Sequence, residues 1–200
     1  MPNLIKLQEY GNMIKCLFDD GTNLLATPTT GGIWLMASSD GSGPGPGPGP
    51  GGGSGTVIYP TVQHTVVDFD GSFAGHEART PPSVNPGCDY APLSIGHAVW
   101  AVADGTVTDI DTSIGGSGGR LIHIDHTALG TGSDYLHLSA IQVAIGQTVT
   151  QGQQIGLSGA SADGSETGVG AHLHISYRTA LGHAYTNFNN IDFDAYIKSL

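Results

Sequence analysis

Short runs of β-branched and apolar residues, separated by turns rich in Gly, Asp and Asn, recur along the chain after residue 56. Apolar and polar positions alternate within these runs, which is typical of half-buried strands. The predicted strands cover residues 98–103, 105–110, 120–125, 133–138, 153–157 and 172–177. Strands this short at this spacing predict an all-β domain, an antiparallel sandwich or a barrel-like sheet. Only residues 190–200 have a helical pattern, with Asp194 early and Lys198 late.

A smaller group of apolar runs precedes residue 41. Residues 13–18 and 23–27 are typical of a hairpin around the turn at residues 19–22, and residues 31–36 of a third strand. About forty residues bury too little apolar surface to be stable alone. We therefore interpret residues 1–40 as a small β-hairpin module that docks to a partner protein or self-associates. The alternative is that residues 1–40 form a flexible extension with no stable fold.

The segment between these two groups, residues 41–55, reads GSGPGPGPGPGGGSG and holds nine of the 32 glycines of the chain. Alternating Gly and Pro cannot propagate a helix or fill the interior of a sheet, and proline favours the extended polyproline II conformation. This composition predicts a semi-stiff linker. The sequence thus predicts a module at residues 1–40, a linker at 41–55 and a main domain at 56–200.

Composition and charge exclude several classes of partner. Six Lys and Arg against 17 Asp and Glu leave a net charge of −11, whereas binding to nucleic acid or an anionic membrane needs clustered cations. The sequence contains no apolar run long enough to span a membrane, and its start lacks the pattern of a signal peptide. The two cysteines, Cys16 and Cys88, lie too far apart in different regions to indicate a disulfide framework.

The candidate site residues are mainly histidines, of which the chain has nine. In His172-Leu173-His174 the period of two on a strand places both imidazoles on one face, while Leu173 and Ile175 face the core. Two imidazoles on one surface suit metal binding or acid–base work; a pair of solvated histidines is the alternative. His137 lies between two leucines in the same alternating pattern and is able to join the same site.

A carboxylate accompanies these histidines. Asp89 follows Gly87 where a loop passes into a strand, and a carboxylate together with imidazoles suits zinc. The segment from His76 to Thr80 begins like the HExxH helix of zinc proteases, but Thr80 stands at the second ligand position and two prolines follow. We therefore discount this segment as a zincin motif.

Several motifs in register resemble the M23 family of zinc metallopeptidases, the LytM and lysostaphin-like endopeptidases of bacterial peptidoglycan. They are Gly87-Cys-Asp-Tyr-Ala91, residues 96–107, Tyr135-Leu-His-Leu-Ser139, residues 143–156 and Gly170-Ala-His-Leu-His174. The resemblance covers roughly residues 70–180. It implies an antiparallel M23/LytM-like β-sandwich that holds a zinc ion. It also implies that this domain cleaves peptide cross-bridges. By this likeness Asp89 and His174 bind zinc, and His137 and His172 are the catalytic histidines.

One position departs from the family pattern. The family has its first zinc ligand, a histidine, four residues before the aspartate, where this chain has Asn85. Asn85 is our expected third ligand, although an amide oxygen is a poorer zinc ligand than an imidazole nitrogen. His76, thirteen residues before Asp89 on an expected loop, is the alternative.

Two functions follow from these observations. The first is a zinc-dependent endopeptidase, and the second is a catalytically degenerate M23-like domain that serves as a structural or cell-wall-binding module. We expect a domain that cleaves the cell wall, follows a small module and a linker, and lacks a signal peptide. This arrangement is typical of an extracellular or virion-associated protein such as a phage tail component. A cellular enzyme exported by another route is the alternative.

Overall fold

The computed structural model describes residues 4–10, 13–18, 23–29, 32–36, 57–182 and 189–200. The chain divides into two compact units, Met1–Gly47 and Pro48–Leu200. The linker expected at residues 41–55 lies outside the described residues.

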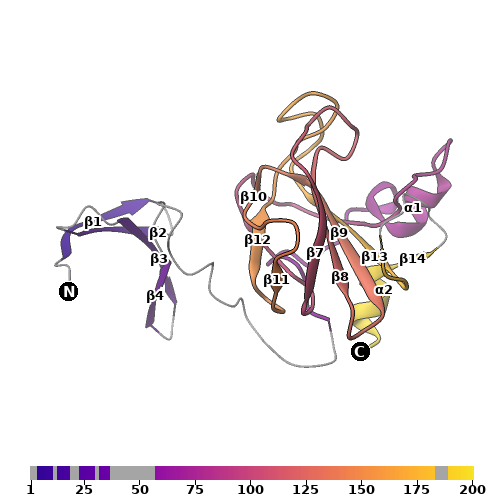
Figure 1. Ribbon diagram of the computed structural model, residues 1–200. Helices are drawn as coiled ribbons and strands as arrows, with labels where there is room; N and C mark the ends of the chain where they lie inside the picture. The colour runs from indigo at the N-terminus through magenta and orange to yellow at the C-terminus, as the bar shows by residue number, and fades with distance from the viewer. Residues whose placement is uncertain (1–3, 11–12, 19–22, 30–31, 37–56, 183–188) are drawn as a thin grey trace. The chain divides into compact units, whose positions relative to one another are not determined.

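The first unit contains a four-stranded antiparallel sheet in which each strand pairs with the next along the chain (Figure 1). Its strands are β1 (Leu4–Tyr10), β2 (Met13–Phe18), β3 (Asn23–Thr29) and β4 (Gly32–Met36). The hydrophobic pattern predicted the last three strands but not β1. The register of β1 with β2 shifts between Leu4 and Lys6, and an irregularity of this kind breaks the simple alternation by which a strand is recognised.

The second unit is built from two further sheets (Figure 1). In the larger sheet the order is β11-β7-β8-β9-β13-β14, with β5 also paired to β13, and every pairing is antiparallel. The smaller sheet has the order β10-β12-β6. The strands are β5 (Cys88–Tyr90), β6 (Ala98–Trp100), β7 (Gly105–Asp111), β8 (Arg120–His126), β9 (Thr131–Leu138), β10 (Ala140–Ile141), β11 (Thr148–Val149), β12 (Gln154–Leu157), β13 (Leu173–Arg178) and β14 (Asn190–Ile191).

The core of this unit draws on both sheets. Val99 of β6 and Ile155 of β12 are fully buried in one cluster with Ile122 of β8, Tyr135 of β9 and Ile175 of β13. Burying alternate apolar residues from each strand is what stabilises a sheet against its neighbour. The prediction of an all-β, antiparallel fold is therefore confirmed.

Among the residues that the structure describes, α-helices occur in two places, although the pattern predicted only the C-terminal one. That helix, α2, spans Phe193–Lys198 and is capped by the side chain of Asp192. The unpredicted helix, α1, spans Phe73–Ala78 and follows a 3-10 turn at Phe69–Gly71. Ser72 caps α1 by accepting a hydrogen bond from the amide of Gly75, so a single turn forms before Pro81 and Pro82 end it. The expectation that His76 lies on a loop was wrong.

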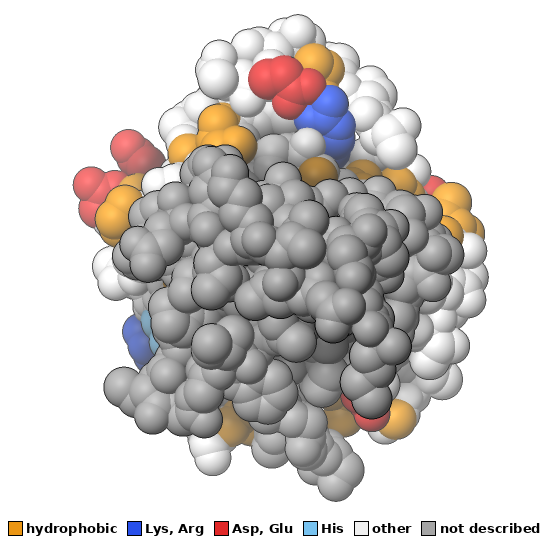
Figure 2. Space-filling model, turned by 90° about the vertical axis from the view of Figure 1, so that its left-hand side faces the viewer, with side chains coloured by type: hydrophobic (Ala, Val, Ile, Leu, Met, Phe, Trp, Pro, Cys, Tyr) orange, Lys and Arg blue, Asp and Glu red, His pale blue; other side chains and the backbone are white. Residues whose placement is uncertain are grey.

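Within the described residues, no helix is both long and apolar enough to cross a membrane. On the face drawn in Figure 2, the visible acidic, basic and hydrophobic side chains are scattered around the margin and form no basic patch among the described residues.

Candidate metal centre

Three neighbouring strands bring most of the expected site residues together. In the larger sheet β13 lies between β5 and β9, and His174 of β13 pairs directly with Asp89 of β5 and with Leu136 of β9. His172 lies just before β13, and His137 follows Leu136 on β9. The β pairing therefore gathers residues that are far apart in the sequence.

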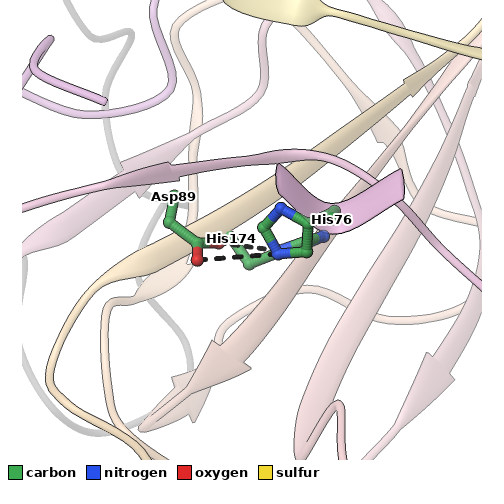
Figure 3. A group of neighbouring side chains, drawn as sticks. All are labelled: His76, Asp89 and His174. Carbon is green, nitrogen blue, oxygen red and sulfur yellow. Dashed lines mark hydrogen bonds and ion pairs between the residues drawn. The ribbon is translucent and has the colours of Figure 1, made fainter. Parts of the chain in front are cut away.

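Helix α1 adds a further histidine to this group. One ligand atom from each of His76, Asp89 and His174 lies within 4.8 Å of the other two, and all three residues are buried (Figure 3). Nε2 of His76 is 3.6 Å from Oδ2 of Asp89, and Nδ1 of His174 is 2.7 Å from Oδ1 of the same carboxylate. The carboxylate of Asp89 thus lies between two imidazoles that come from a helix and a strand.

Backbone carbonyl groups orient both of these imidazoles. Nδ1 of His76 is 2.8 Å from the carbonyl oxygen of Ser72, and Nε2 of His174 is 3.1 Å from the carbonyl oxygen of Asn85. A carbonyl oxygen only accepts hydrogen bonds, so the ring nitrogen that faces it carries a proton. Nε2 of His76 and Nδ1 of His174 face Asp89, and they are the nitrogens left to bind a cation held beside its carboxylate.

The protonation of the group favours binding of a cation. Burial and the neighbouring His174 lower the pKa of His76 to about 4, so its ring is neutral at neutral pH. Burial raises the pKa of Asp89, but hydrogen bonds from His172 and His174 outweigh this effect and hold it well below its usual range. Two imidazoles and one carboxylate form a donor set that suits zinc, so the residues fit the metal implied by the resemblance.

His137 and His172 lie beside this donor set. Their ring centroids are 4.7 Å apart, and the ring of His137 is 6.0 Å from that of His174. Nε2 of His172 is 3.5 Å from Oδ1 of Asp89. The structure therefore places both expected catalytic histidines next to the candidate metal ligands.

The backbone holds these two side chains as well. Nδ1 of His137 donates to the carbonyl of Ser161 at 3.1 Å, and Nδ1 of His172 donates to the carbonyl of Gly170 at 2.6 Å. His137 has a φ of 62°, a left-handed conformation that is rare for a residue other than glycine. Backbone strain of this kind clusters at functional sites. Burial and the neighbouring His172 lower the pKa of His137 to about 4, whereas Asp89 outweighs burial and raises the pKa of His172.

Two glycine-rich loops meet at His137. The amide of His137 donates to Gly118 in the loop before β8, and its ring donates to Ser161 in the loop after β12. Arg120 and Glu166 join the same two loops through a bidentate ion pair with both contacts at 2.6 Å. The two glycine-rich loops are therefore linked to each other beside the histidines.

Asn85 does not join the donor set. Its amide nitrogen donates to Oδ2 of Asp134 at 3.3 Å, and its amide oxygen accepts from Asn190 at 2.8 Å. Only its backbone carbonyl reaches the site, where it faces His174. His76 instead occupies the third position beside Asp89 and His174.

The importance of His76 was hard to find in the sequence because its spacing from Asp89 matches no motif. The available signal was Ser72, a typical N-cap residue four positions earlier, since it starts the helical turn that carries His76. The hydrogen bonds of Asn85 gave no signal, because Asp134 and Asn190 are distant in sequence.

Comparisons with known proteins identify the family of the chain. The model of peptidase family M23 matches residues 83–188. A Haemophilus influenzae protein described as an uncharacterized metalloprotease is 39% identical over 93 residues, which are 46% of this chain and 18% of that protein. The chain thus spans about a fifth of the length of this curated relative.

Solved structures of peptidases align with this chain. A Pseudomonas aeruginosa structure assigned to peptidase M23 aligns with a TM-score of 0.52 at 19% identity, covering 100% of this chain and 93% of that one. The catalytic domain of the antimicrobial peptidase lysostaphin from Staphylococcus simulans is 25% identical with a TM-score of 0.48, covering 74% of this chain and 92% of that one. Because the family model matches more than half of the sequence, this chain belongs to peptidase family M23.

Proposed function

We propose that this chain is a zinc-dependent endopeptidase that hydrolyses peptide cross-bridges of bacterial peptidoglycan. The observation that carries the proposal is the convergence of His76, Asp89 and His174 on one point, with His137 and His172 beside it. His76, Asp89 and His174 would hold the metal. His137 and His172 would be the catalytic histidines.

The metal ligands and the two further histidines would have different roles in the reaction. A zinc ion held by the three ligands would polarise the scissile carbonyl and lower the pKa of the attacking water. Because Nδ1 of His137 and of His172 is directed at a backbone carbonyl, Nε2 is the atom of each ring that exchanges protons with the substrate. One Nε2 accepts the proton of the water, and the other donates to the developing oxyanion or to the leaving amine.

The substrate class rests on the family resemblance and on the loops. The linked loops around Gly118 and Ser161 are glycine-rich and would form walls that admit an extended, unhindered peptide. The lysostaphin domain with which the structure aligns is named as an antimicrobial peptidase. Peptide bridges of a bacterial wall are the substrate that fits both observations.

The alternative, a degenerate module that has lost its metal, depended on Asn85 being the third ligand. With His76 beside Asp89 and His174, the donor set has two imidazoles and a carboxylate without Asn85. This supports the enzyme over the non-catalytic module.

The test is hydrolysis by the full chain. Purified protein loaded with zinc is expected to release free amino groups from purified peptidoglycan, and a chelator is expected to stop the release. A His137→Ala variant provides the inactive control, because it removes a proton-transfer group and leaves the three metal ligands in place. Zinc-loaded protein that leaves peptidoglycan intact would support the binding module instead.

We further propose that the first unit attaches the peptidase to a larger assembly outside the cell, such as a phage tail. Its support is the small size of the four-stranded sheet and the Gly-Pro composition of residues 41–55. Analytical ultracentrifugation tests self-association: the full chain is expected to form oligomers, and a chain that begins at residue 56 is expected to be monomeric. If both chains are monomeric, the attachment proposal requires a different partner protein.

A further inference from the structure

We propose that Asn85 positions the metal ligand His174 and is not itself a ligand. In this account its backbone carbonyl orients the imidazole, and its side chain anchors that carbonyl to the sheet. The inference rests on the metal site proposed above, and it assigns a role to the residue at which this chain departs from the family pattern.

The first step concerns the ring of His174. Nε2 of His174 has two neighbours, the carbonyl oxygen of Asn85 at 3.1 Å and Oγ of Ser176 at 3.0 Å. Oγ of Ser176 itself donates to the same carbonyl at 3.3 Å, so its oxygen remains free to accept. Both neighbours thus favour a proton on Nε2, so a bound metal would take Nδ1, which faces Oδ1 of Asp89 at 2.7 Å.

The second step concerns how the carbonyl is held. Nδ2 of Asn85 donates to Oδ2 of Asp134, and Oδ1 of Asn85 accepts from Nδ2 of Asn190. The same nitrogen of Asn190 also donates to the carbonyl of Pro86 at 2.9 Å. An amide side chain is the group that offers a donor to a carboxylate and an acceptor to another amide at one position.

The third step is the rigidity of the anchor. Asp134 is buried on β9, where it accepts from Nδ1 of His123 at 2.7 Å and from Nη1 of Arg178. Its carboxylate is therefore held by neighbouring strands independently of Asn85. Charge-assisted hydrogen bonds of this kind are stronger than neutral ones.

The segment at residues 85–87 packs closely against the ring of His174. A Cβ atom added at Gly87 would lie 2.7 Å from Nε2 of His174, so the backbone at residues 85–87 packs directly against the imidazole. A shift of the segment would therefore move or release the ring.

Metal affinity tests the inference in the full chain. The zinc dissociation constant is measured by competition with a chromophoric chelator for Asn85→Ala and Asn190→Ala, with Asn189→Ala as the control because that side chain is exposed. Loss of an outer-shell partner typically weakens metal binding about 10- to 100-fold. We expect a weakening of that size for the first two variants, with one zinc per chain still bound at saturation, and no change for the control.

Two spectroscopic readouts distinguish positioning from mere destabilisation. In the cobalt-substituted protein, the visible absorption bands of Asn85→Ala are expected to shift, because the geometry of His174 changes. In the zinc-loaded wild type, long-range proton–nitrogen NMR is expected to show the proton of His174 on Nε2. A metal bound at Nε2 would overturn the inference.

The variant Asn85→His separates this account from that of a lost ligand. If position 85 had lost a metal ligand, the histidine introduced by Asn85→His would tighten zinc binding. Because the side chain at residue 85 is directed at Asp134 and Asn190, we expect Asn85→His to weaken binding.

Tighter binding by Asn85→His, or wild-type affinity with an unchanged cobalt spectrum in Asn85→Ala, would overturn the positioning role while leaving the peptidase proposal standing. A wild-type chain that binds no zinc would overturn both.

Discussion

Every histidine of the candidate site is oriented by a backbone carbonyl. His76, His137, His172 and His174 each have one ring nitrogen within 3.1 Å of a main-chain oxygen. The second nitrogen of each ring is the atom that we propose binds the metal or meets the substrate. Residues held in this way are preorganised, because their rings do not have to reorient when the ligand or substrate arrives.

The first prediction at this scale separates proton transfer from metal binding. His137→Gln is expected to lower kcat for peptidoglycan hydrolysis by about 10²- to 10⁴-fold, since the proton-transfer group is lost. Zinc stoichiometry, measured by atomic absorption, should stay at one per chain. His97→Gln, at an exposed position, is the matched control and should leave kcat unchanged. Loss of zinc from His137→Gln would instead make His137 a ligand.

The second prediction concerns the pH dependence of stability without metal. Burial lowers the pKa of His76 and of His137 from 6.5 to about 4. Between pH 6.5 and 4 the unfolded chain therefore binds more protons than the folded one, so the free energy of unfolding falls as pH falls through this window. Thermal melts of the chelator-treated protein should show Tm decreasing from pH 6.5 to 4.

The variant His137→Gln should weaken this dependence, because it removes one of the two groups. His172 does not oppose the trend, since its pKa is raised and its contribution is fully present below pH 6.5. A Tm that stays constant across the window would show that these imidazoles are not buried as neutral groups.

At the scale of elements, the sequence predicted the strands well and the helix α1 poorly. Alternation marks β7, β8, β9 and β13 because each buries apolar residues on one side, and the expected bounds lie within two residues of the observed ones. Helix α1 is a single turn, too short for a 3.6-residue period to be visible. The third imidazole of the site lies on this turn, so it was the site residue hardest to predict.

The third prediction tests whether α1 delivers the ligand. Ser72→Ala removes the side chain that accepts from the amide of Gly75 at 3.0 Å, and loss of such a cap costs about 1 kcal/mol. Because the carbonyl of Ser72 also orients His76, we expect weaker zinc binding as well as a lower Tm. The control is Ser117→Ala, an exposed serine in another loop. Unchanged zinc affinity in Ser72→Ala would show that the helix does not position a metal ligand.

At the scale of the whole molecule, the chain divides into two compact units, and the finer division into a module, a linker and a main domain stays a prediction. The proposed boundary at residues 41–55 rests on the Gly-Pro pattern alone. Sequence could not show which distant residues meet, because the contact of Asn85 with Asp134 and Asn190 arises only from the arrangement of β9 and β14 beside β13.

The fourth prediction is that the second unit works alone. All five proposed site residues and the hydrophobic core lie between Val57 and Leu200. A chain that begins at residue 56 should therefore keep the Tm, the zinc affinity and the hydrolysis rate of the full chain on a soluble peptide substrate. A large loss of zinc affinity on truncation would place part of the site in the first unit.

The central claim is that His76 completes the metal centre, and the zinc content of two variants tests it most directly. After saturation with zinc and removal of the excess, the wild type and Asn85→Ala should each retain one zinc per chain, whereas His76→Ala should retain little or none. Full zinc in His76→Ala together with its loss from Asn85→Ala would contradict the account.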